Sequence, residues 1–201
     1  MKYDQIIIHI DPDSFEELVN AICQEILGLG IFSFTKGPDG GKDGRFTGSA
    51  NNYPSSQNPW NGKMIIQAKH TALAGATCSS GEFFTNLSSV VNKEIDRLVK
   101  LKKAEGLDYY LLFTNRKYTG KNDADIIKKI SSGIGLPESN IAIIGIETIN
   151  SLLNRHPEIA RRYNLRKHYI PFAFSDQDIK ALIIKFHNSL SDQTELKDKV
   201  E

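Results

Sequence analysis

The sequence KMIIQAK, residues Lys63 to Lys69, predicts a β-strand with a polar end. Its apolar residues are followed by a glutamine and a lysine that are two positions apart. Because successive side chains of a strand point to opposite faces, Gln67 and Lys69 fall on the same face and Ala68 on the other. The stretch therefore places two polar side chains side by side where the strand ends.

Helices and strands are predicted to alternate on both sides of this strand. Apolar residues at helical spacing from Ser14 predict a helix that ends at Gly28 and Gly30, and residues 31–35 predict a short strand. In chain order, the pattern downstream predicts a helix at 82–104, a strand at 109–114, a helix at 123–132, a strand at 141–144 and a helix at 147–154. In the helix at 82–104, Leu87 is expected inside and Arg97 outside. The fold class is therefore α/β, with a mixed central β-sheet flanked by helices.

Three polar or basic segments interrupt this pattern. Residues 49–62 predict a long hairpin loop in which Trp60 is exposed. Residues 155–168 are basic, and a last amphipathic helix is predicted at 176–190. We therefore expect residues 1–169 to form one domain and residues 170–201 to be a helical extension or a link to a partner.

The composition limits the classes of function and the compartment. The 201 residues carry a formal net charge of +1, so attraction to nucleic acid requires a local patch. The residues predicted to contact phosphates in such a patch are Lys100, Lys103, Arg161 and Arg162, with Trp60 reaching into a groove. Basic runs are equally typical of helix faces that are exposed to solvent. With 2 cysteines no disulfide framework is implied, and a cytoplasmic location is expected. The apolar run at residues 6–10 is too short to span a membrane, and no targeting segment is expected.

A glycine-rich stretch, GPDGGKDG from Gly37 to Gly44, precedes the central strand. It reads either as an ordinary turn or as a turn that holds Asp43 for a purpose. A hard cation such as Mg²⁺ prefers oxygen ligands, and Asp43, the Gln67 side chain and the Ala68 carbonyl offer them. Lys69 beside such an ion is suited to orient or help deprotonate an attacking water and to offset charge at phosphorus.

A carboxylate of the first long helix is a further candidate. Glu16 lies at the edge of the apolar stripe, from which its side chain is able to lean toward the same site. Each of these features also has a plain structural reading when it is taken alone. Asp-Gly pairs make turns, a lysine protects an edge strand from aggregation, and a glutamate near a helix start favours the helix dipole.

Taken together and in order, FEELV, GPDGGKDG and IIQAK resemble the catalytic signature of the Mrr-like branch of the PD-(D/E)XK nucleases, which have the restriction-endonuclease-like fold. In this branch glutamine often replaces the acidic residue before x-K. The resemblance implies that Glu16 is the helix glutamate, Asp43 the metal-binding aspartate, Gln67 the substituted acid and Lys69 the catalytic lysine. It gives Asp39, the first aspartate of the turn, a less direct role in bracing the turn or supporting the substrate.

What this resemblance implies is a metal-dependent DNA endonuclease that uses Mg²⁺ or Mn²⁺ on double-stranded DNA, in a restriction or anti-phage system. Cutting both strands requires two sites, so a homodimer or higher assembly is expected, and an ATPase or another defence-system partner is also implied. The alternative is a catalytically silent module that binds nucleic acid or a partner, because Gln67 leaves the site with one negative charge less. A small-molecule α/β enzyme lacks support, since GPDGGKDG matches neither a Walker A loop nor G-x-G-x-x-G.

Overall fold

The structure is a computed structural model that describes residues 2–33, 44–118 and 123–165, together with 177, 179–181 and 183–186. The chain divides into two compact units, Met1–Arg166 and Lys167–Glu201. In the second unit the described residues are helical, and the exposed side chains of Ile179, Ile183, Ile184 and Phe186 lie on them. The first unit contains the sheet and is described below.

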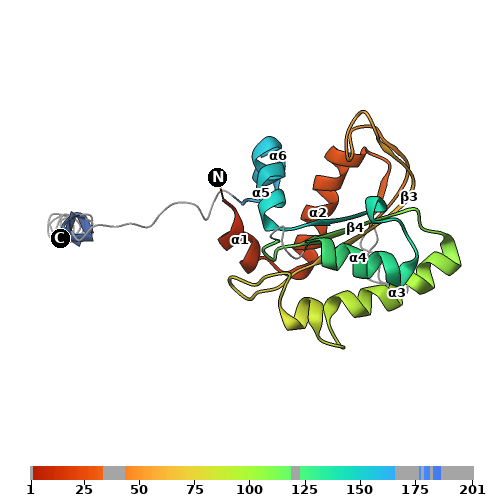
Figure 1. The fold of residues 1–201 in the computed structure, drawn as a ribbon. Coiled ribbons are helices and arrows are strands. Elements are labelled where there is room, and N and C mark those ends of the chain that lie inside the picture. Colours follow the sequence, from red (N-terminus) through yellow and green to blue (C-terminus); the bar gives the residue numbers. More distant parts are fainter. Residues whose placement is uncertain are drawn as a thin grey trace, which may run out of the picture. The chain divides into compact units, whose positions relative to one another are not determined.

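A mixed sheet of five strands forms the centre of the first unit (Figure 1). The strands lie side by side in chain order: β1 Ile31–Ser33, β2 Gly44–Ala50, β3 Trp60–Lys69, β4 Tyr109–Thr114 and β5 Ile141–Ile144. β1, β2 and β3 pair in antiparallel fashion, whereas β3, β4 and β5 are parallel. The predicted mixed α/β sheet is confirmed, and the change of direction occurs at the strand that ends in Lys69.

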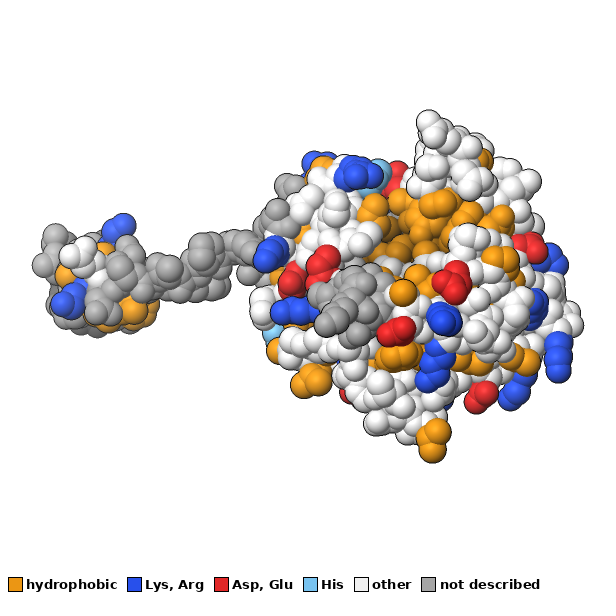
Figure 2. Space-filling model, viewed as in Figure 1, with side chains coloured by type: hydrophobic (Ala, Val, Ile, Leu, Met, Phe, Trp, Pro, Cys, Tyr) orange, Lys and Arg blue, Asp and Glu red, His pale blue; other side chains and the backbone are white. Residues whose placement is uncertain are grey.

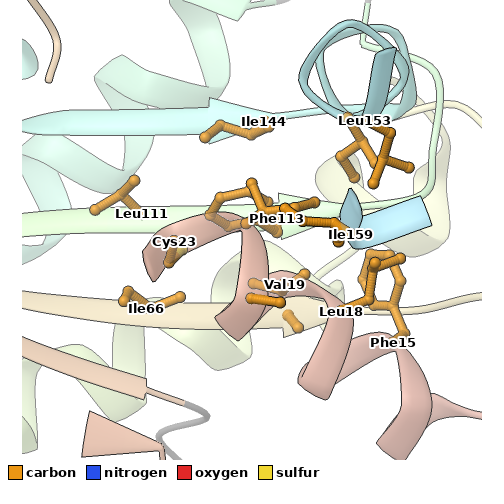
Figure 3. Close-up of a cluster of buried hydrophobic side chains, with 14 of the residues drawn as sticks. Phe15, Leu18, Val19, Cys23, Ile66, Leu111, Phe113, Ile144, Leu153 and Ile159 are labelled. Atoms are coloured by element: carbon orange, nitrogen blue, oxygen red, sulfur yellow. The ribbon is translucent and has the colours of Figure 1, made fainter. Parts of the chain in front are cut away.

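Helices cover both faces of the sheet. One layer contains α1 Asp4–His9, α2 Pro12–Leu27, α5 Ile146–Arg155 and α6 Pro157–Arg162, and the other contains α3 Val90–Glu105 and α4 Asp123–Ile134. Figure 3 shows the core of the first layer, in which side chains of α2, α5 and α6 gather over Ile66, Phe113 and Ile144 from three neighbouring strands. Apolar side chains thus fill the space between the sheet and each helical layer.

The alternation of β3 assigns its polar end to one of these layers. Met64, Ile66 and Ala68 belong to the core on the α2 side, whereas Ile65 belongs to the core on the α3 side. Gln67 and Lys69 continue the sequence of odd positions, so they fall on the α3 side. Gln67 and Lys69 therefore share one face of β3, as predicted, and this face is the one that α3 covers.

The first long helix begins with a cap at Asp11. Its carboxylate accepts hydrogen bonds from the Ser14 N–H (2.9 Å) and the Ser14 hydroxyl (2.6 Å), and these bonds lower the pKa of Asp11. Pro12 occupies the first turn, where its missing N–H costs nothing. The helix ends before Gly28, which has a positive φ of 119°, as the sequence predicts.

The prediction of one helix over residues 82–104 is wrong. A π-helical turn, η1 (Gly81–Thr85), is followed by a break, and α3 begins at Val90. Ser89 caps α3 by accepting a hydrogen bond from the Asn92 N–H at 3.3 Å. Polar side chains that bond to nearby backbone favour such a break over a continuous helix. Leu87, expected inside, lies in the break and is 97% exposed.

The predicted exposure of Trp60 is also wrong. Trp60 is the first residue of β3 and is 5% exposed. Its ring stacks on Tyr109 with the centroids 4.6 Å apart and meets the edge of Tyr53 at 4.9 Å. The loop is shorter than the predicted 49–62, because β2 extends to Ala50 and β3 starts at Trp60. A buried indole is not available to reach into a groove of DNA.

Candidate active site

Lys69 is the last residue of β3, and the chain that follows it is firmly held. The Thr114 hydroxyl donates to the Lys69 carbonyl at 2.8 Å. The Asn115 side chain then bonds both the N–H (2.9 Å) and the carbonyl (2.7 Å) of Thr71. These bonds tie the end of β3 to the end of the neighbouring β4. The Lys69 side chain therefore starts from a fixed backbone and, at 33% exposed, remains open to solvent.

The ammonium group of Lys69 is paired with a buried carboxylate. Lys69 Nζ lies 2.9 Å from Glu94 Oε1, and the Glu94 side chain is 5% exposed. Glu94 belongs to α3, in the layer that the alternation of β3 assigns to Lys69. The two charges thus meet between a strand and the helix that covers it.

The other oxygen of Glu94 is bound by two further residues. Glu94 Oε2 accepts hydrogen bonds from Arg97 Nε at 2.9 Å and Arg97 Nη2 at 2.5 Å, and from the Tyr110 hydroxyl at 3.2 Å. Burial raises the pKa of Tyr110 well above its ordinary value, and the neighbouring Glu94 charge raises it further. Arg97, expected outside the helix, instead bonds inward, and its side chain is 17% exposed. The cluster Lys69–Glu94–Arg97–Tyr110 therefore has one carboxylate between two cations.

Gln67 and Ala68 bring oxygen-bearing groups together next to Lys69. Gln67 is 3% exposed, and its Nε2 lies 3.5 Å from the Ala68 carbonyl oxygen. The amide carries its oxygen and nitrogen on one carbon, so a half-turn of that group exchanges them. Both groups carry oxygen, the ligand atom that a hard divalent ion prefers, so their chemistry fits such an ion.

Asp39 and Asp43 lie outside the described residues, so their roles stay predictions. The next residue, Gly44, opens β2 and pairs with Ile66, the neighbour of Gln67. A Cβ on Gly44 would meet Asn20 Oδ1 of α2 at 2.6 Å, which is too close for a side chain. The chain thus resumes, directly after Asp43, beside the strand that carries Gln67.

Glu16 is half-buried on α2, in the helical layer opposite Glu94. The first turns of α2 lie beside the end of β3, because the rings of Phe15 and His70 are 5.4 Å apart. His70 is packed, with its Nε2 2.7 Å from the Ile7 carbonyl oxygen. Glu16 therefore comes from a helix that adjoins the end of β3, and its role in the site stays a prediction.

The basic residues predicted to contact nucleic acid lie in opposite layers. Lys100 and Lys103 are exposed on α3, and Arg161 and Arg162 are exposed on α6. Figure 2 shows acidic and basic side chains interspersed over the visible face. Because the two pairs lie on opposite sides of the sheet, one straight DNA duplex is not expected to contact both of them. The DNA-binding roles of all four residues stay predictions.

A second group of ionisable residues lies where Glu25 of α2 meets His156, between α5 and α6, and Glu158 of α6. His156 Nδ1 is 3.4 Å from Glu158 and 3.8 Å from Glu25, and all three side chains are partly or fully exposed. Glu25 follows Phe15 by ten residues, which is about 15 Å along a helix. The spacing of this group would suit an ion. The group is nevertheless separate from the end of β3.

Glu94 is the residue that the reasoning from sequence missed. It shares the apolar stripe of α3 with Val91, Leu98 and Leu101, all of which are buried at helical spacing. A charged residue within such a stripe has to find a buried partner. The position of Glu94 within the apolar stripe was therefore the signal that the sequence offered. Lys69, at the end of β3, is one of its partners.

A family model described as restriction endonuclease, of the Mrr catalytic type, matches residues 7–136, more than half of the chain. The match includes α2, β3 and α3, the elements that carry Glu16, Gln67, Lys69 and Glu94. Neither a curated protein nor a solved structure matches the chain. Within the part of the chain that is described, no helix has the length and apolar character to cross a membrane.

Proposed function

Because the chain belongs to the Mrr-like restriction endonuclease family, we propose that it is a metal-dependent endonuclease that hydrolyses phosphodiester bonds of double-stranded DNA. The observation that carries this proposal is the Lys69 ammonium, which is held 2.9 Å from Glu94 at the end of β3, on the strand face that also carries Gln67. A cation next to oxygen donors suits the stabilisation of charge on a phosphate. A restriction or anti-phage role is the biological setting that we propose for this activity.

The residues proposed to hold Mg²⁺ or Mn²⁺ are Asp43, Gln67, Ala68 through its carbonyl, and Glu16. The oxygen chemistry of these groups supports this set, as does the position of Gln67 next to Ala68 on β3. When bound, such an ion supplies a Lewis acid that polarises the phosphate and its water ligands. Asp39 is proposed to brace the turn that leads to Asp43, and only secondarily to contact the substrate.

Lys69 is proposed to orient the attacking water and to offset the negative charge that grows on the phosphate. Its pairing with Glu94 at 2.9 Å favours this electrostatic role over that of a proton acceptor, because the ion pair involves the ammonium form. Removing one preorganised donor of this kind lowers the rate of an enzyme by about 10²–10³-fold. A loss of that size is expected for Lys69→Ala.

The alternative function is a catalytically silent module that binds nucleic acid or a partner. Gln67 favours it, because a neutral amide in place of a carboxylate leaves a weaker site for a cation. The two functions differ in their need for metal. DNA binding that persists in EDTA, without nicking at high protein concentration, would favour the silent module.

We propose that residues 1–169 act as the nuclease domain and that residues 170–201 dimerise or link the domain to a partner. A homodimer or higher assembly is proposed because cutting both strands requires two sites. An ATPase or other defence-system protein is a candidate partner, and the cytoplasm is the proposed compartment. Sedimentation velocity compares the oligomeric state of the full chain with that of a chain that lacks residues 170–201. Loss of the dimer on truncation would support the proposed role of this segment.

Metal binding tests the proposed site. Calorimetric titration of Mg²⁺ and of Mn²⁺ is compared for the wild type, Asp43→Ala and Gln67→Ala, with Asp96→Asn as an exposed acidic control on α3. The first two substitutions should weaken binding and the control should leave it unchanged, while far-UV spectra stay alike. Equal binding by Asp43→Ala and the wild type would remove Asp43 from the site.

A further inference from the structure

We infer that Glu94 is a positioning residue for Lys69, in that it holds the ammonium group where the reacting phosphate is to be bound. This inference deepens the proposed nuclease function and rests on it. The two residues come from different elements, β3 and α3, and lie in the same layer. The distance of 2.9 Å between Lys69 Nζ and Glu94 Oε1 is that of a charge-assisted hydrogen bond.

Lys69 needs such a partner because its side chain is flexible. A lysine ammonium sits on a four-carbon stem whose free rotamers must be lost before it holds one position. The strand fixes the backbone of Lys69 through the Thr114 hydroxyl bond, but it leaves the end of the side chain undetermined. Glu94 supplies the missing restraint from the helix above it.

Glu94 is itself held so that one oxygen is directed to Lys69. Arg97 and Tyr110 both bind Oε2, and Oε1 is the atom that meets the lysine. The carboxylate is thus fixed from one side by two donors and presents its other side to the site. This division between the two oxygens gives the carboxylate a single orientation.

The charges of the cluster leave Lys69 able to attract an anion. Glu94 alone would neutralise the lysine, but the Arg97 guanidinium bonds the same carboxylate. Two cations around one anion give a net positive unit. Of the three charged side chains Lys69 is the most exposed, at 33% against 17% for Arg97 and 5% for Glu94, so the unit presents its positive charge to solvent mainly through the lysine.

A merely structural ion pair is the competing explanation, since buried pairs are weak evidence for either stability or function. The two explanations differ in what they predict for DNA cleavage by a folded variant, because only a positioning role makes cleavage depend on Glu94 through Lys69. Glu94→Gln keeps the shape of the side chain and removes its charge. Asp96→Asn, an exposed position two residues along the same helix, makes the same chemical change away from the cluster.

The first experiment measures the reactivity of Lys69 without requiring cleavage. Brief acetylation of the full chain, read by mass spectrometry, is expected to modify wild-type Lys69 more slowly than the exposed Lys93. Glu94→Gln should raise the rate at Lys69, and Asp96→Asn should leave it unchanged. Equal rates at Lys69 in the wild type and Glu94→Gln would overturn the inference, whether or not the protein is a nuclease.

The second experiment measures single-turnover cleavage of plasmid DNA in a double-mutant cycle. Glu94→Gln should slow cleavage by about 10- to 100-fold, the usual loss for a partner that orients a site residue, with DNA affinity unchanged. In a Lys69→Met background the same change should have little further effect, because Glu94 acts through Lys69. Independent, additive losses would overturn the inference, and so would weakened metal binding by Glu94→Gln with Lys69 labelling unaltered.

Folding of each variant is checked by far-UV spectra and by the fluorescence of Trp60, which is buried in the core. Should Glu94→Gln not fold, Glu94→Asp keeps the charge and shortens the side chain by one methylene. In Glu94→Asp we then expect faster labelling of Lys69 and slower cleavage of DNA than in the wild type. If the wild type does not cleave DNA with either metal, the proposed function fails, and the labelling result still decides whether Glu94 holds Lys69.

Discussion

Glu94 Oε1 lies 2.9 Å from Lys69 Nζ, and this contact joins the end of β3 to the first turns of α3. The two residues are separated in the chain by the η1 turn and the break before Val90. The contact gives the lysine of the Q-x-K strand a carboxylate partner that the strand itself does not carry. Several expected outcomes depend on this cluster and on the core around it.

Arg97→Ala should lower the free energy of unfolding by about 1.5–3 kcal/mol, the range for hydrogen bonds to a charged group. The reason is that both hydrogen bonds from Arg97 to the buried Glu94 carboxylate are lost. Urea unfolding followed by far-UV circular dichroism measures the change. Lys93→Ala, an exposed change on the same helix, serves as the control. An unaltered midpoint in Arg97→Ala would show that Glu94 does not need this partner.

Tyr110 should make the fold sensitive to alkaline pH. Burial, and then Glu94, raise its pKa above the ordinary value of 10.0, so the folded protein binds this proton more tightly than the unfolded chain. The resulting stability is complete below about pH 10 and is lost as the pH rises through the folded pKa. Tyr110→Phe should therefore flatten the decline of the unfolding free energy as the pH rises above about 10. A decline as steep as in the wild type would contradict this origin.

Trp60, the single tryptophan of the chain, should be shielded in the folded protein. Acrylamide should quench its fluorescence weakly in the native state and strongly in urea. Adding DNA should leave its emission unchanged, since the ring packs between Tyr53 and Tyr109. Trp60→Ala should destabilise the fold by about 3–5 kcal/mol, as for other buried aromatics. Strong quenching of the native protein would contradict the burial of this ring.

The two basic pairs should differ in their contribution to DNA binding. The Tyr163 hydroxyl bonds the Glu17 carbonyl at 3.0 Å, which places α6 beside the first turns of α2 and hence near the end of β3. Lys103 follows Glu94 by nine residues, about 13 Å along α3. Arg161→Ala with Arg162→Ala should therefore weaken binding more, and reduce its salt dependence more, than Lys100→Ala with Lys103→Ala. Fluorescence anisotropy at several salt concentrations measures this, and the opposite order would contradict it.

Much of the architecture could be predicted from periodicity. The alternation of β3, the apolar stripe of α2 and the glycine at its end are local signals, and the structure confirms the elements they predict. Sequence reasoning missed the break before α3 because apolar residues continue at helical spacing through Leu87. The competing bonds, which the Ser89 side chain accepts and the Asn92 side chain donates, are visible only in the folded backbone.

The candidate site could be predicted only where its residues lie on one element. Gln67 and Lys69 share a face of β3 because of strand geometry alone. Glu94 joins them through packing of α3 on the sheet, which requires knowledge of which helix covers which face. Trp60 was predicted wrongly for a related reason, because its polar neighbours in the chain obscured the aromatic partner on β4. Tertiary contacts, rather than local pattern, determined both residues.

Cleavage of supercoiled plasmid in Mg²⁺ or Mn²⁺ provides the sharpest test of the nuclease function. The wild type is compared with Lys69→Ala and with Lys93→Ala, an exposed lysine on α3 that serves as the matched control. We expect nicked and linear products from the wild type and the control, a rate about 10²–10³-fold lower for Lys69→Ala, and no cleavage by any of them in EDTA. Equal cleavage by the wild type and Lys69→Ala would contradict the assignment of the site to the end of β3.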